Sequence, residues 1–460
     1  MKYNTTHLHL APGLDAPLRH LTKHMLITGA SGTGKSTTAG AVVERLSDHG
    51  IPVIVLDAKG DLESLTTGEV INPDGETVPR AGSVVCPYGE RGKRRRLHVG
   101  AMGGDLVARA LELSEAQTGA LNIALYWAQD QGQEVASLDD LRRTLAHVVE
   151  IRESLFADYG LVTPGSVAAI QRAVLPLDRA AGDAFGAPAF DPFDHTDIGE
   201  VTVINCGQLS ETQGAYGALC AWIVDSLYRG APEVGNVSRP RLAVLIDESH
   251  LIFDGATPAV VRRMEQAARL IRSRGIMLIF ATQSPADLPD AISAQLLTRI
   301  QHGLRGSTPR QMRGIRAAAE SMPAEPGRDL QREIMGLGVG EAVCSVPDDH
   351  GAPGIARRVR MSPGKIRLRP LDDDELTLDP EPGPISLASV SAPGPISLAY
   401  GGTPEPVRPG PPKRASDEWV TMGRQRGRFH VSEITPTKEW PAPPWWMYAI
   451  VWGFIALMFV

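Results

Sequence analysis

The chain has 460 residues, of which 43% are apolar and 22% charged, and its formal net charge is −7 at pH 7. These values are ordinary for a globular protein and exclude a chain whose overall charge attracts nucleic acid or anionic lipid, so any such contact is local. The four cysteines lie far apart and form no C-x-x-C pair. This spacing indicates free thiols in a reducing compartment rather than a metal or disulfide framework.

The N-terminal segment, residues 1–20, contains no apolar run of signal-peptide length. We therefore expect the domain that follows to remain in the cytoplasm. That domain is predicted to consist of residues 21–103 and 181–360, with residues 104–180 as a mostly helical insertion between the two parts.

A glycine-rich loop follows the apolar run Met25–Ile27 and leads directly into a helical pattern. It fits G-x-x-x-x-G-K-[ST] at every fixed position. Glycines let backbone N–H groups surround phosphate oxygens, Lys35 can reach the β- and γ-phosphates, and the Ser36 hydroxyl can ligate Mg²⁺. The sequence therefore predicts a site for ATP and Mg²⁺ formed by Gly29, Ala30, Ser31, Gly32, Thr33, Gly34, Lys35, Ser36 and Thr37.

Strand and helix patterns alternate along the rest of this domain. Apolar runs predict strands at residues 51–56, 83–86, 201–205, 242–246, 276–280, 299–304 and 342–346. Amphipathic patterns predict helices at residues 35–48, 215–228 and 258–273. This order favours an α/β fold with a doubly wound, mostly parallel sheet that binds ligands at the carboxyl ends of its strands.

An acidic pair, Asp247 and Glu248, follows the strand at residues 242–246. Asp247 is expected to hold Mg²⁺, and Glu248 is expected to act as general base on the attacking water. Alone, such a pair is weak evidence, because it can simply cap the next helix. Together with the phosphate-binding loop it predicts hydrolysis of the nucleotide. Asp57 and Asp61, which end the second strand, either assist the metal site or only form a turn.

The segment around the strand at residues 276–280 carries the remaining catalytic candidates. We expect this strand to lie beside the strand that precedes Asp247, which would place Gln283 near the γ-phosphate as a sensor. Before the strand, Arg269, Arg272 and Arg274 crowd the end of a helix. Arginines there can simply complement the helix dipole. An arginine finger supplied by a neighbouring subunit would also neutralise transition-state charge, and it would require a ring.

Composition changes near residue 361. Residues 361–444 hold 16 of the 36 prolines, which predicts a largely disordered linker over residues 361–440. Residues 445–460 carry no charge and follow several arginines and tryptophans. This pattern predicts a C-terminal apolar helix at residues 441–460 that anchors the protein to the inner face of the cell membrane. The alternative is an apolar tail that docks on a partner or on the protein's own domain.

The chain resembles the FtsK–HerA superfamily of ring-forming P-loop ATPases, and it is most similar to the bacterial HerA-like group without the N-terminal barrel. The resemblance spans about residues 20–350 and rests on HMLITGASGTGKST, IPVIVLDAKGDL, LAVLIDESHLIFDGA and RLIRSRGIMLIFATQSPADLPDAISAQLLTRIQHGLRGSTPRQ. It implies a RecA-like fold, a hexameric ring with nucleotide between subunits, and DNA in the pore. Arg272 matches the family's trans finger, with Arg274 and Arg299 as substitutes. The proline-rich tail departs from the family pattern.

DNA contact has the weakest support in the sequence. The densest basic run, Arg91–Arg96, is either a loop that neutralises phosphates or a solvated loop without such a role. Two functions therefore stay open. One is a ring ATPase that translocates or unwinds DNA, and the other is an NTP-dependent oligomeric scaffold that acts on a partner protein.

Overall fold

The computed structural model describes residues 6–71, 77–88, 91–212 and 214–376. The protein divides into two units, residues 1–400 and residues 401–460, and only the first contains described residues. Most of the linker and the whole C-terminal segment expected at residues 441–460 thus lie outside the described part. Within that part, no helix is both long and apolar enough to cross a membrane.

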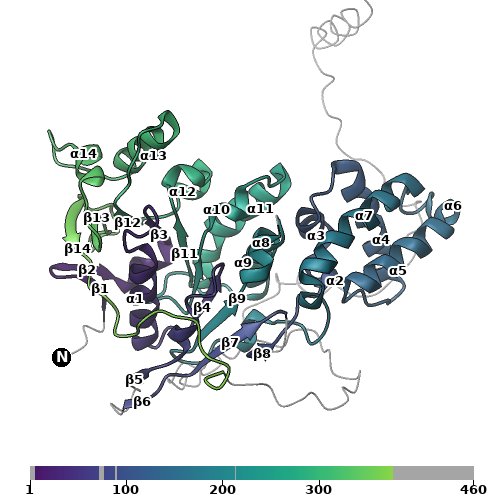
Figure 1. Cartoon of the computed structure of the whole chain (residues 1–460), viewed down its shortest axis with the longest axis horizontal. Helices are drawn as coiled ribbons and strands as arrows, with labels where there is room; N and C mark the ends of the chain where they lie inside the picture. The colour runs from purple at the N-terminus through teal and green to yellow at the C-terminus, as the bar shows by residue number, and fades with distance from the viewer. Residues whose placement is uncertain (1–5, 72–76, 89–90, 213, 377–460) are drawn as a thin grey trace, which may run out of the picture. The chain divides into compact units, whose positions relative to one another are not determined.

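A ten-stranded sheet runs through the described part of the chain, in the order β14-β13-β12-β3-β11-β10-β4-β9-β7-β8 (Figure 1). All neighbouring strands from β12 to β8 are parallel, and β13 and β14 add antiparallel at one end. The strands are β3 (Met25–Thr28), β4 (Val53–Asp57), β7 (Gly82–Cys86), β8 (Lys93–Arg94), β9 (Val201–Asn205), β10 (Leu242–Ile246), β11 (Ile276–Thr282), β12 (Thr298–His302), β13 (Glu341–Ser345) and β14 (Arg357–Arg360).

This sheet confirms the predicted mixed α/β fold with mostly parallel strands. Two short antiparallel hairpins lie apart from it: β1 (His7–Ala11) with β2 (Leu14–Pro17), and β5 (Glu69–Ile71) with β6 (Thr77–Pro79). The helices are α1 (Lys35–Asp48), α2 (Val99–Met102), α3 (Gly104–Ala110), α4 (Glu115–Asp130), α5 (Leu138–Glu150), α6 (Arg152–Leu155), α7 (Pro164–Ala181), α8 (Gly207–Glu211), α9 (Ala215–Gly230), α10 (His250–Phe253), α11 (Pro258–Leu270), α12 (Asp290–Ser293), α13 (Pro309–Glu320) and α14 (Leu330–Met335).

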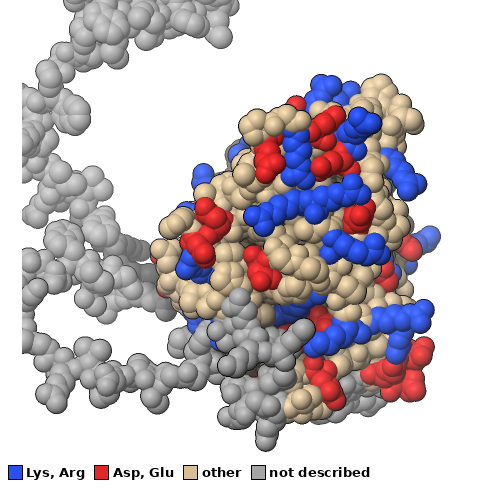
Figure 2. Space-filling model, turned by 90° about the vertical axis from the view of Figure 1, so that its left-hand side faces the viewer, with Lys and Arg blue, Asp and Glu red and all other residues tan. Residues whose placement is uncertain are grey.

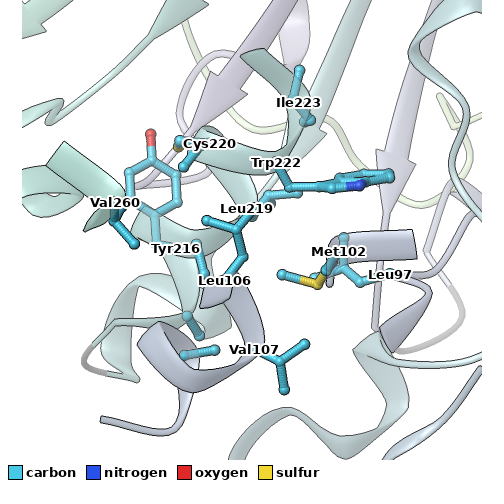
Figure 3. Packing of buried hydrophobic residues seen from close by; sticks show 14 of the residues in the cluster. Leu97, Met102, Leu106, Val107, Tyr216, Leu219, Cys220, Trp222, Ile223 and Val260 are labelled. Carbon is cyan, nitrogen blue, oxygen red and sulfur yellow. The ribbon is translucent and has the colours of Figure 1, made fainter. Parts of the chain in front are cut away.

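The two faces of the sheet are buried against different layers, because successive side chains of a strand point to opposite faces. On one face, Val244 and Ile246 of β10 belong to a core shared with α3, α9 and α11. On the other face, Ala243 and Leu245 belong to a core shared with α1 and with the β1–β2 hairpin. Figure 3 shows the first layer, where Leu106 of α3 lies among α9 side chains. Burial on both faces explains why these strands read as continuous apolar runs.

Residues 361–376, which the sequence places in the linker, instead pack on the core. Backbone N–H groups of Lys365 and Ile366 donate to the buried carboxylate of Glu44 on α1. The N–H of Leu371 donates to the buried carboxylate of Glu63. Buried carboxylates require such donors. Proline content indicated a linker here, but these backbone contacts could not be seen in the composition.

Candidate nucleotide-binding site

The glycine-rich loop connects β3 to α1, as the sequence predicts. Gly32 and Gly34 have φ angles of +76° and +107°, which favour glycine over residues with a side chain. A Cβ built on Gly32 meets open space, whereas one on Gly34 would lie 3.2 Å from the Gly340 nitrogen. The loop is therefore open toward solvent at Gly32 and tightly packed beneath Gly34.

The amides of this loop leave room for an anion. The N–H groups of Ala30 and Thr33 donate to backbone carbonyls, of Gly303 and Ala30 respectively. Within the described residues, no backbone acceptor pairs with the N–H groups of Ser31, Gly32, Gly34, Lys35, Ser36 and Thr37. Unpaired N–H groups at a helix N-terminus form a site for phosphate. The backbone thus has the form that the motif requires.

The acidic pair follows β10, where the structure stores local strain. Glu248 has a φ angle of +43°, which non-glycine residues rarely adopt. The Asp247 N–H donates to the Leu56 carbonyl at 3.1 Å, and the buried Tyr216 hydroxyl lies 2.5 Å from the Asp247 carbonyl oxygen. These contacts fix the backbone of the pair against the neighbouring strand β4 and helix α9.

The side chains of the acidic pair are buried beside Lys35. The Lys35 Nζ lies 3.3 Å from Glu248 Oε1, and both side chains are less than a tenth exposed. Asp247 Oδ2 and Glu248 Oε2 are buried without a hydrogen-bond partner in the described structure. Burial raises the pKa of Asp247, although the positive charges of Lys35 and Lys59 oppose this shift. The arrangement brings together the predicted residues of the phosphate loop and of the acidic pair.

Two residues at this site were missed by sequence reasoning. Lys59, just after β4, places its Nζ 2.5 Å from Glu248 Oε1. His302, at the end of β12, is buried beneath the loop, and a Cβ on Gly29 would lie 2.5 Å from its Cβ. Burial lowers the pKa of His302 to about 4. The signal for Lys59 was its place after a buried strand, next to two aspartates. His302 had no comparable signal, because its contact with the loop arises only from the pairing of β12 with β3.

Asp57 forms a turn, which is one of the two roles that the sequence suggests for it, the other being assistance to the metal site. Its carboxylate accepts the N–H groups of Lys59, Gly60 and Leu62 at 2.8–3.0 Å. Burial raises the pKa of Asp57 to about 6, against the effect of these hydrogen bonds. Asp61 is half-buried, and its Oδ1 has no hydrogen-bond partner within the described residues. Asp57 thus shapes the turn that carries Lys59.

Gln283 follows β11, which lies between β3 and β10, as expected. Its exposed side chain therefore stands at the same edge of the sheet as the phosphate loop and the acidic pair. Arg272 lies before β11, in the short helix η5 (Ile271–Arg274). The seven residues of β11 separate the two positions by about 20 Å. Arg272 thus lies at the opposite edge from the nucleotide site of its own chain.

The three arginines considered as fingers differ in their contacts. The Arg272 side chain is exposed and makes no hydrogen bond or ion pair within the described residues. Arg274 donates to the Ala231 carbonyl and lies over the Tyr228 ring. Arg299 donates to the Ser293 carbonyl and hydroxyl. Arg274 and Arg299 are therefore occupied inside their own chain, and of the three only the Arg272 side chain has no such contact among the described residues.

The basic run Arg91–Arg96 is not an exposed loop. It contains the edge strand β8, and its side chains are half-buried. Arg91 forms an ion pair with Asp373, and Arg96 donates to the Ala187 carbonyl. These contacts weaken its assignment as a phosphate-binding loop.

All four cysteines are buried and free, which agrees with the free thiols predicted from their spacing.

The residues at the site fit a nucleotide with Mg²⁺. Within the described residues, no cluster of three His, Cys, Asp or Glu side chains could hold a metal alone. Mg²⁺ in phosphate sites needs only one or two protein ligands, because phosphate oxygens and waters complete its shell. Ser36 and the unpaired Asp247 Oδ2 are suited to that role. The donor set and the open amides of the loop thus match such a ligand.

Comparisons with solved structures find proteins that share this fold. Plasmid coupling protein TrwB in complex with ADP and Mg²⁺ is similar over 79% of this chain and 90% of its own, with 15% identity and a TM-score of 0.55. VirB4 of Thermoanaerobacter pseudethanolicus is similar over 78% of this chain and 96% of its own, with 14% identity and a TM-score of 0.53. A search of curated proteins returned no match.

A family model gives the assignment that these low identities cannot. The model described as "Helicase HerA-like C-terminal" matches residues 11–385, which include the whole ten-stranded sheet and the helices described above. The chain therefore belongs to the HerA-like helicase C-terminal family.

Proposed function

We propose that the protein is a ring-forming ATPase of the HerA type that couples ATP hydrolysis to movement along DNA. The observation that carries this proposal is the division of catalytic groups between two edges of the sheet. The phosphate loop, Asp247 and Glu248 lie at one edge, while the unpartnered Arg272 lies about 20 Å away at the other. A complete site then requires two copies of the chain.

The roles of the residues follow from their chemistry. Lys35 and the loop amides bind the phosphates, while Ser36 and Asp247 hold Mg²⁺, which neutralises charge on the β- and γ-phosphate oxygens. Glu248 accepts a proton from the attacking water, and Gln283 orients that water. Arg272 of a neighbouring subunit stabilises the charge that develops on the transferred phosphoryl group. Family membership and the TrwB complex with ADP and Mg²⁺ support these assignments.

Helix α13 supports DNA over a partner protein as the substrate. Arg310, Arg313 and Arg316 are exposed and have no hydrogen-bond or ion-pair partner among the described residues. Their spacing turns them away from the buried side of the helix, along about 9 Å of its axis. Figure 2 looks onto the side of the molecule that carries β14, where Lys and Arg side chains lie among Asp and Glu side chains. Such a stripe can neutralise successive phosphates.

The buried side of α13 connects this stripe to the nucleotide site. Ile315 and Ala318 belong to a core against which Ala30 of the phosphate loop packs. A Cβ on Gly314 would lie 2.7 Å from the Ser284 hydroxyl, next to Gln283. A displacement of α13 by bound DNA would therefore be transmitted through these contacts to the phosphate loop and to the end of β11.

The test is the ATPase rate of the full chain with and without duplex DNA, across a range of salt concentrations. We expect stimulation by DNA that weakens steeply with salt. The triple variant Arg310→Ala, Arg313→Ala, Arg316→Ala should keep the DNA-free rate and lower the salt slope of DNA binding by about two to three. Arg172→Ala, an exposed arginine on α7, is the control. Hydrolysis that responds to a partner protein and not to DNA would favour the scaffold.

Membrane attachment is a separate part of the proposal. It rests on the absence of charge in residues 445–460 and on the arginines that precede them. Cell fractionation of the full chain beside a variant with Ile450, Val451 and Phe454 changed to Asp tests it. Attachment predicts that only the unaltered chain sediments with membranes.

A further inference from the structure

The positions of the phosphate loop and the acidic pair set the direction in which a bound triphosphate lies. In the strand order β13-β12-β3-β11-β10, the phosphate loop follows β3 and the acidic pair follows β10. The γ-phosphate is the group that reacts, so it lies toward Asp247, Glu248 and Gln283. Because the loop amides bind successive phosphates, the nucleoside at the other end of the ligand lies on the opposite side, toward β12 and β13.

A short turn of the protein lies on that side of the phosphate loop. Strand β12 is parallel to β3, and β13 pairs antiparallel with β12, with Ala342 opposite His302. The residues that precede β13 therefore lie at the carboxyl edge of the parallel strands, which is also the edge of the phosphate loop. They form a turn at residues 338–341, and two strand spacings place β13 about 10 Å from β3.

This turn is held firmly against the phosphate loop. The Gly340 N–H donates to the Thr33 carbonyl at 3.0 Å, and a Cβ on Gly34 would lie 3.2 Å from the Gly340 nitrogen. Glu341 closes the turn, because its N–H donates to the Gly338 carbonyl at 3.1 Å and its carboxylate accepts the Gly338 N–H at 2.7 Å. The position of the turn relative to the bound phosphates is therefore fixed by the protein itself.

The tip of the turn is Val339, whose side chain faces solvent. It is 67% exposed, and no large apolar side chain in the described part of the chain is more exposed. Single exposed apolar residues are common on protein surfaces. Val339 differs from them because its own turn is bonded to the phosphate loop. An apolar side chain gains free energy when another apolar surface covers it, and the face of a nucleobase is such a surface.

We propose that Val339 contacts the nucleoside of the bound nucleotide and favours nucleoside triphosphates over inorganic polyphosphates. This inference rests on the proposed ATPase function and adds the residue that binds the nucleoside. The occupant is the nucleoside because the direction of the triphosphate brings it to this turn. Contact through methyl groups is non-directional, so it recognises the face of a base rather than its hydrogen-bonding edge.

The experiment compares the full-length Val339→Ala variant with wild type for two ligands, ATP and inorganic tripolyphosphate, each with Mg²⁺. Isothermal titration measures both affinities. We expect Val339→Ala to weaken ATP binding by about three- to tenfold and to leave tripolyphosphate binding unchanged, because the lost methyl groups contact only the nucleoside. The KM for ATP should rise while kcat stays the same, since this contact is equal in the ground state and the transition state.

The matched control is Ile355→Ala, which also truncates an exposed apolar side chain. Ile355 is 52% exposed and precedes β14, near the opposite end of β13 from the turn. This variant should bind both ligands as wild type does. Because Val339 and Ile355 are both exposed, neither substitution removes a side chain from the core.

A larger side chain at the same position gives a second readout that needs no turnover. The indole of Val339→Trp can stack on the base, so this variant should bind ATP more tightly than Val339→Ala does and bind tripolyphosphate as wild type does. Its tryptophan fluorescence should be quenched by ATP and not by tripolyphosphate. The change is measured against wild type, which has seven tryptophans of its own.

Three results would overturn the inference. One is a Val339→Ala variant that binds ATP with wild-type affinity. Another is an equal loss of affinity for ATP and tripolyphosphate, which would mean that the turn only shapes the phosphate loop. The third is fluorescence of Val339→Trp that responds to both ligands alike. Each leaves the proposed ATPase function intact if wild type hydrolyses ATP and Lys35→Ala binds both ligands weakly. A wild-type protein that binds neither ligand would instead overturn the proposed function and this inference together.

Discussion

The two ends of β11 differ in how their charged groups are satisfied. At the carboxyl end, Lys35 Nζ lies 3.3 Å from Glu248 Oε1, and both side chains are buried, as is Asp247. At the other end, Arg272 is exposed and has no partner in the described residues. Arg274, two residues further on, is held by its own chain.

Under the proposed function, this difference corresponds to two incomplete half-sites in a single chain. The buried cluster has its geometry in the isolated chain, and among the described residues Lys35 and Lys59 are the lysines that contact Glu248. An exposed arginine without a partner gains one only from another molecule. Because a strand of seven residues keeps the two ends apart, the proposed function assigns the second half-site to a neighbouring copy.

The largest expected effect is that of removing Arg272, the exposed arginine before β11. We expect Arg272→Ala to lower the ATPase rate by about 10³–10⁵ while nucleotide affinity changes little, because an arginine finger acts on transition-state charge. ATP turnover and binding of a fluorescent nucleotide analogue measure the two effects. Arg269→Ala, which changes a nearby exposed arginine on α11, serves as control. A fall in affinity equal to the fall in rate would contradict the assignment.

Removal of the proposed general base, Glu248, is expected to stop turnover but not nucleotide binding. Glu248→Gln keeps the shape of the side chain but cannot accept the proton, so turnover should fall by about 10²–10⁴. Binding of ATP should persist, because Lys35 and the loop amides are unchanged. Isothermal titration with ATP and Mg²⁺ measures the binding. A variant that hydrolyses ATP at the wild-type rate would remove Glu248 from the chemistry.

A buried histidine near Arg272, His24, is expected to make the stability of the fold depend on pH. Burial lowers the pKa of His24 to about 4, and its two ring nitrogens bond the Ala268 carbonyl and the Leu278 N–H. The unfolded chain binds this proton near pH 6.5, so acidification from pH 6.5 to 4 favours unfolding. We expect the free energy of unfolding to fall by an amount on the order of 2 kcal/mol when the pH is lowered from 7 to 5, as measured by urea unfolding.

The matched test for this pH effect is His24→Gln. This variant should be less stable than wild type at pH 7, since buried hydrogen bonds are altered, but its stability should depend less on pH. An unchanged slope between pH 7 and 5 would show that His24 is not the group responsible. His302, whose pKa is also lowered to about 4, would then be the next histidine to change.

Much of this architecture could be predicted from the sequence because its strands are buried on both faces. The strands β9 and β10 have the predicted bounds, and the phosphate loop lies between β3 and α1 as its motif requires. Other elements gave no such pattern. The hairpin β1–β2 alternates over only a few residues, and β14 has charged side chains along an edge.

The contacts of Lys59 and His302 could not be predicted for a different reason. Both depend on which strands are neighbours in space: β4 beside β10 for Lys59, and β12 beside β3 for His302. The alternation of strands and helices predicts a parallel sheet but not the full order of its strands. In contrast, the link between Lys35 and Glu248 could be inferred, because the chemistry of phosphate transfer requires both groups at one site.

Mixing two inactive variants tests most directly whether the ATPase site forms between neighbouring chains. The Arg272→Ala variant retains the phosphate loop and the acidic pair, and the Lys35→Ala variant retains Arg272, the proposed arginine finger. If the site forms between copies, the mixture should recover part of the wild-type ATPase rate, with a maximum at an intermediate ratio of the two variants. A mixture with no more activity than the sum of its separate components, under conditions where both variants assemble with wild type, would contradict a site shared between neighbouring chains.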